Sequence, residues 1–142
     1  MGITITAGYP DAPSYSMGYI NFWNLRKAVA TAADPKFGEI YADLPKVGHI
    51  INPKDYEKRM SDYLKKHPLP LRFLDFLYQS DTDGSLSPCK CKAVYDRICH
   101  AEHMKPYKLY GYTAQARKCM TWEQFKELLL GCYSNKSYMK WS

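Results

Sequence analysis

The chain has 142 residues, of which 46% are hydrophobic and 24% charged. This size and composition predict a single globular domain over residues 1–142 and exclude a disordered or collagen-like chain. No apolar run approaches the ~18 residues of a membrane-spanning helix, so we expect no membrane partner. The first six residues lack the basic region and apolar stretch of a secretory signal.

Charge and cysteine content restrict the setting and the partners. The net charge is +6, and it is uneven: residues 1–45 hold three basic and four acidic side chains, whereas residues 46–142 hold 17 and 10. A basic surface of this size favours an anionic partner, such as a nucleotide, a nucleic acid or an acidic protein face. Five cysteines without a secretory signal indicate a reducing compartment, so we expect a cytoplasmic protein.

The N-terminal third predicts one strand and two helices. Residues 3–6 alternate between apolar and polar side chains, which is typical of a half-buried strand. Residues 8–18 are rich in turn formers and are expected to form a loop. Helical spacing of apolar side chains starts near Ile20 and is stopped by Asp34-Pro35, and one or two further helical turns fit residues 37–41.

Three later helices carry clear start signals. Asn52-Pro53 and Ser87-Pro88 each place an N-cap residue before a proline at the first helical position. Thr121 and Gln124 match a capping box. After Asn52, apolar side chains form one amphipathic stripe, at positions Tyr56, Met60, Tyr63 and Leu64.

Residues 70–78 are so apolar that we expect a central, buried helix. The polar turn after it, residues 80–84, is predicted to use Gly84 for a positive φ. Residues 137–141 alternate and could pair with the N-terminal strand. Together these elements predict a mostly helical α+β fold, with about five helices and a two- or three-stranded sheet that joins the termini.

Two segments are candidate binding loops. The first precedes a helix, where serine hydroxyls and free backbone N–H groups suit a phosphate. The second interleaves aromatic and basic side chains, which combine base stacking with phosphate contacts. The expected ligand-binding residues are Tyr15, Ser16, Tyr19 and Arg26 in the first segment, and Tyr107, Lys108, Tyr110 and Arg117 in the second. A capped helix and a loop held by packed tyrosines are the alternative interpretations.

The sequence gives weaker support for a catalytic site or a metal site. The potential zinc ligands are Cys89, Cys91, Cys99 and His103, but their spacing differs from the usual C-x2-4-C pairs. The chain contains no G-x-S-x-G, H-E-x-x-H or glycine-rich phosphate-loop motif. We therefore expect no cofactor, no metal and no enzymatic activity.

Two short segments carry a resemblance. Residues 14–19 with Arg26, and residues 77–86 with their Ser-Asp-x-Asp-Gly turn, resemble small phage and prophage proteins of Gram-positive bacteria. Those proteins often have His before the serine of the turn and Cys after its first aspartate, where this chain has Gln79 and Thr82. The resemblance implies a phage accessory protein in a bacterial cytoplasm.

These observations lead to one functional prediction and two alternatives. We expect a non-catalytic accessory protein that counters host defence, either by sequestering an anionic nucleotide or by occluding a host defence protein, as anti-CRISPR proteins do. Sequestering a nucleotide often needs a dimer or higher oligomer to build the pocket, so a homo-oligomer is part of that prediction. The alternatives are a nucleic-acid-binding module and a small zinc- or thiol-dependent enzyme.

Overall fold

The computed structural model describes residues 2–101, 109–110 and 120–142. Within them the fold is mostly helical α+β, as expected from the sequence. The strands are β1 (Ile3–Ala7), β2 (Tyr15–Met17), β3 (Gly84–Leu86), β4 (Leu109–Tyr110), β5 (Met120–Thr121) and β6 (Met139–Trp141). The helices are α1 (Tyr19–Ala33), α2 (Pro35–Tyr41), the 3-10 turn η1 (Leu44–Lys46), α3 (Pro53–Lys66), α4 (Leu71–Tyr78), α5 (Pro88–Ile98) and α6 (Trp122–Ser134).

The main sheet has the strand order β2-β1-β6-β3, and all neighbouring strands are antiparallel. Ile5 lies opposite Trp141, so the two ends of the chain pair as predicted. Strands β2 and β3 were not predicted, and the loop expected at residues 8–18 is wrong for residues 15–17. Each of these strands has only three residues, which is too short for an alternating pattern to stand out from a loop.

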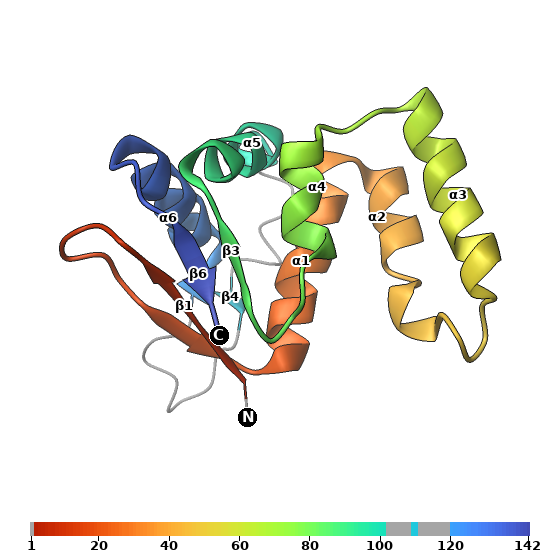
Figure 1. The fold of residues 1–142 in the computed structure, drawn as a ribbon, viewed down its shortest axis with the longest axis horizontal. Coiled ribbons are helices and arrows are strands. Elements are labelled where there is room, and N and C mark those ends of the chain that lie inside the picture. The colour runs from red at the N-terminus through yellow and green to blue at the C-terminus, as the bar shows by residue number, and fades with distance from the viewer. Residues whose placement is uncertain (1, 102–108, 111–119) are drawn as a thin grey trace.

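One face of the sheet is packed against helices, and the other faces solvent. Figure 1 shows α5 and α6 behind the sheet, with α1 and α4 beside them. Alternation along the strands turns Ile3 and Ile5 of β1 and Trp141 of β6 into this core. Thr6 and Lys140 occupy the opposite, exposed face.

The helix starts follow the predicted capping signals. The Asn52 side chain accepts a hydrogen bond from the backbone N–H of Lys54 at 2.8 Å, and Ser87 caps α5 in the same way. At α6, the Thr121 hydroxyl accepts from the N–H of Gln124 at 3.1 Å, while the Gln124 side chain accepts from the N–H of Thr121 at 3.0 Å. All three predicted caps are confirmed.

Helices α2 and α3 form a projecting part of the molecule, at the right of Figure 1. α3 is tied to the preceding segments by Arg59, whose guanidinium lies 3.1 Å from the carboxylate of Asp43, and by the Tyr63 hydroxyl, which donates to Asp34 at 2.7 Å. No helix of the described ranges is long and apolar enough to cross a membrane.

Helix α4 only partly fits its predicted role as a buried helix. Phe73, Phe76 and Leu77 are buried, but Leu71 is 84% exposed and Tyr78 is 54% exposed. Both exposed residues lie on the side of α4 that α3 leaves uncovered, because α3 packs on α2 instead.

Candidate functional site

Arg26 of α1 connects the two segments that carried the sequence resemblance. Its side chain is 5% exposed, and one guanidinium nitrogen (Nη2) donates to the backbone carbonyls of Gln79 and Ser80, at 2.8 and 3.3 Å. The guanidinium lies 4.8 Å from the ring centre of Phe22 and 5.7 Å from that of Trp141. These contacts hold the C-terminus of α4 against α1.

The charge of Arg26 has no carboxylate partner within ion-pair distance among the described residues. Burial lowers its pKa, an effect opposed by nearby Tyr41 and Asp81, but a guanidinium stays protonated at any physiological pH. The carbonyls at the α4 terminus and the electron-rich ring faces take the place of a counter-ion. Arg26 therefore has a structural role, because it connects α1 to the end of α4 and is not an exposed ligand contact.

Gly84, at the end of the polar turn, has a different role from the predicted one. Gly48 is the only glycine with a positive φ in the described part of the chain, so the positive φ expected for Gly84 is wrong. A Cβ at position 84 would lie 2.2 Å from the Trp141 ring. Glycine is needed there because the indole of the cross-strand neighbour covers it.

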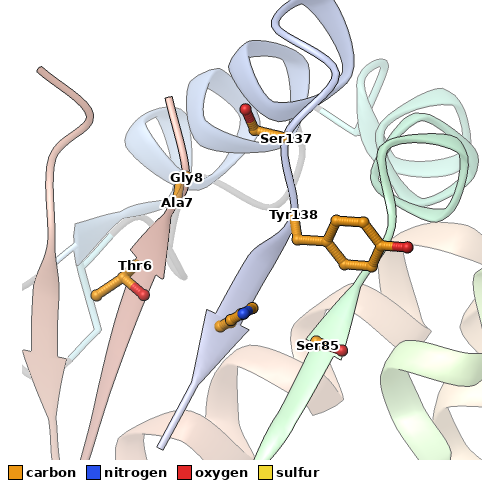
Figure 2. A pocket seen from close by; sticks show the side chains of 7 residues that line it. Thr6, Ala7, Gly8, Ser85, Ser137 and Tyr138 are labelled. Carbon is orange, nitrogen blue, oxygen red and sulfur yellow. The ribbon is translucent and has the colours of Figure 1, made fainter. Parts of the chain in front are cut away.

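A polar concave surface lies on the face of the main sheet opposite the helices (Figure 2). It is a pocket of about 550 Å³, which we call the sheet-face pocket. Its lining residues come from β1 and the turn after it, β3, and β6 and its approach: Thr6, Ala7, Gly8, Ser85, Ser137, Tyr138 and Lys140. Thr6, Lys140 and Ser85 lie opposite one another across the three strands, which sets their side chains in one row.

The polar side chains of the sheet-face pocket can all donate hydrogen bonds. Three are alcohols, one is a phenol and one is an ammonium group, and none of the described lining residues is Asp, Glu or His. Within the described ranges, Lys140 has no ion pair, and the hydroxyls of Thr6 and Ser85 have no hydrogen-bond partner. Such a group of free donors suits the oxygens of an anion. Its described residues include none of the His, Asp or Glu side chains that most often act as a general base.

Tyr138 lies at the edge of this pocket with 51% of its surface exposed. In Figure 2 its ring projects from the start of β6 toward β3. An exposed aromatic face next to a group of donors is the arrangement that combines base stacking with phosphate contacts in proteins that bind single-stranded nucleic acid.

The first predicted binding segment is divided between the two faces of the sheet. Tyr15 points into the core, where burial raises its pKa, and its ring is not accessible to a base. Ser16 is on the exposed face, and its hydroxyl lies 3.1 Å from that of Thr4. Tyr19 starts α1 and is partly exposed. The structure therefore does not bring Tyr15, Ser16 and Arg26 into one site.

The second predicted segment is largely outside the described residues. This is the case for Tyr107, Lys108 and Arg117, and for the side chain of Tyr110, whose backbone pairs with Met120 in a two-stranded sheet. Their expected role in binding stays a prediction.

The cysteines on α5 and at its C-cap do not form a common site. Cys89 is exposed, Cys91 is buried and Cys99 is half-buried, while His103 lies outside the described residues. The structure places no group of three or more His, Cys, Asp or Glu side chains that could hold a metal ion within the ranges it describes. Hydrogen bonding with Cys132, together with burial, raises the pKa of the Cys91 thiol, which does not suit a nucleophile.

Comparison with known proteins finds no matching family model, no matching curated protein and no matching solved structure. The case for the candidate site therefore comes from its geometry. Sequence reasoning did not identify Thr6, Ser85 or Lys140. The alternating pattern at residues 3–6 and 137–141 could have indicated two of them, because it assigns Thr6 and Lys140 to the exposed face.

Proposed function

We propose that this protein is a non-catalytic binder of a small phosphate-bearing ligand of the nucleotide class, which it holds in the sheet-face pocket. The hydroxyls of Thr6 and Ser85 and the ammonium of Lys140 would contact the phosphate. Tyr138 would stack on the base. Sequestration of such a ligand would make the protein a stoichiometric sink rather than a catalyst.

The observation that carries the proposal is the one-sided chemistry of the pocket. Among the described residues of the lining, Lys140 is the only charged one, and no carboxylate there competes with a bound anion. The row across β1, β6 and β3 is held by backbone pairing, so its donors are arranged before a ligand binds. Preorganised donors lose less entropy on binding than donors on a mobile loop.

Three expectations stay predictions: the phage setting, the action against host defence and the homo-oligomer. The proposed binding would act against host defence if the ligand is a defence signal. The binding step can be tested without that assumption.

The test is calorimetric titration with a panel of nucleoside mono-, di- and triphosphates and cyclic dinucleotides. We expect at least one to bind, and we expect Lys140→Ala and Thr6→Val each to weaken binding about tenfold, as for a lost charge-assisted or neutral hydrogen bond. Lys36→Ala is the matched control, because it removes the same charge from an exposed position on α2. The proposal fails if no member of the panel binds below ~1 mM, or if Lys140→Ala binds as tightly as Lys36→Ala.

Oligonucleotides distinguish the main alternative. A nucleic-acid-binding module would prefer single-stranded DNA or RNA to every mononucleotide, with an affinity that falls steeply with salt. That result would replace the proposed function.

A further inference from the structure

A second surface, independent of the sheet-face pocket, lies between α3 and α4. It is a groove of about 530 Å³, which we call the α3–α4 groove. Its walls are mainly apolar side chains: Tyr56, Met60 and Leu64 from α3, and Leu71, Leu74 and Tyr78 from α4. In Figure 1 these two helices lie apart, with α2 seen between them.

Two apolar side chains of the α3–α4 groove are largely exposed. Leu71 begins α4 and is 84% exposed, and Tyr78 ends the same helix with more than half of its surface exposed. Burying a leucine of this kind stabilises a complex by roughly 2 kcal/mol. Apolar groups collected in a groove, rather than scattered singly, are typical of a protein-binding surface.

The rim of the groove is basic. Lys54, Lys58 and Lys65 fall within ~40° of one another around α3, on the side of the helix next to the groove. All three side chains are exposed, and none forms an ion pair with another described residue.

Among the described residues of the lining, Glu57 is the one carboxylate. Asp75 of α4 lies outside this lining and is paired with Lys90 at 2.7 Å. The complementary occupant therefore has an apolar stripe and acidic flanks.

We propose that the α3–α4 groove docks an acidic amphipathic helix of a partner protein. Apolar side chains of the partner, spaced one helical turn apart, would fill the groove between Met60 and Leu71, and its Asp or Glu side chains would face the lysines of α3. A second copy of this chain fits less well, because two surfaces of a protein with a net charge of +6 repel each other.

The test is selection from a displayed library of random 16-residue peptides, with the full chain as bait and Leu71→Asp for counter-selection. We expect enriched peptides with apolar residues at i, i+3 or i+4, and i+7, flanked by Asp or Glu. Leu71→Asp should lower the affinity for the best peptide at least tenfold. Lys58→Glu should lower this affinity at low salt, and the difference from the wild type should disappear at high salt.

Two controls keep the outcome interpretable. Ile50→Asp changes an equally exposed apolar side chain outside the groove, and Lys140→Ala changes the sheet-face pocket, so both should leave peptide affinity unchanged. Because Leu71 is exposed, its variant should keep the thermal stability of the wild type. No enrichment, enrichment of basic peptides, or equal loss in Ile50→Asp would overturn the proposal. A concentration-dependent dimer that Leu71→Asp abolishes would also overturn it, in favour of self-association.

Discussion

Replacement of Gly84 by alanine should destabilise the fold through a single, well-defined clash. The new Cβ would lie 2.2 Å from Cζ2 and 2.4 Å from Cε2 of the Trp141 ring, where ordinary contacts start near 3.4 Å. The ring cannot move away easily. It is 1% exposed, its Nε1 donates to the Ser80 carbonyl at 2.9 Å, and it packs against Phe22 and Phe76 with ring centres 5.6 Å apart.

The size of the effect follows from two opposing contributions. Overpacking of a rigid core site costs about 3 kcal/mol at the upper end, and removing a strand glycine recovers roughly 0.5–1 kcal/mol of backbone entropy. The expected net loss is about 2 kcal/mol, which corresponds to a fall in melting temperature of about 6 °C for a domain of this length.

Thermal denaturation followed by circular dichroism measures this loss directly. Gly8→Ala is the matched control, because its nearest neighbour outside the adjacent residues would be Ser137 Cβ at 3.7 Å, an ordinary contact. If Gly84→Ala and Gly8→Ala melt within ~2 °C of each other, the argument that Trp141 requires a glycine at position 84 is refuted.

Two further predictions concern buried polar groups. Arg26→Lys should lower the free energy of unfolding by about 2 kcal/mol in urea titrations. The planar guanidinium bonds to the Gln79 carbonyl and lies against the aromatic rings at the same time, and a compact ammonium group cannot do both. An unchanged urea midpoint would contradict this. Burial raises the pKa of Tyr41 and raises that of Tyr56 to about 12, from 10.0. The unfolded chain releases these protons first, so stability that is complete below pH 10 should be lost as the pH rises from 10 to 12. Equal unfolding free energies at about pH 9 and pH 11 would exclude this linkage.

The features that were predictable from the sequence are those set by residues a few positions apart. The caps at Asn52, Ser87 and Thr121 are examples, because each side chain bonds to a backbone N–H two or three residues further on. The strand at residues 3–6 and its partner near the C-terminus followed from alternation alone. Such local interactions hold in any tertiary arrangement that contains the element.

Other features depend on pairs of residues far apart in the chain, and here the sequence was insufficient. Gly84 is a turn residue by its neighbours, but its partner Trp141 is 57 positions away, and only strand pairing brings the ring over it. Arg26 was a candidate ligand contact until packing placed it beneath the end of α4. The three-residue strands β2 and β3 form because β1 and β6, brought together by the pairing of the chain ends, offer them unpaired backbone groups.

Both candidate binding surfaces also depend on tertiary structure. The sheet-face pocket needs Thr6, Ser85 and Lys140 on adjacent strands in register, and no local pattern specifies that β6 lies between β1 and β3. The α3–α4 groove exists because α3 packs on α2 and leaves the apolar side of α4 uncovered. The sequence by itself predicted which residues would be apolar, basic or capped, whereas long-range packing decided which of those residues meet.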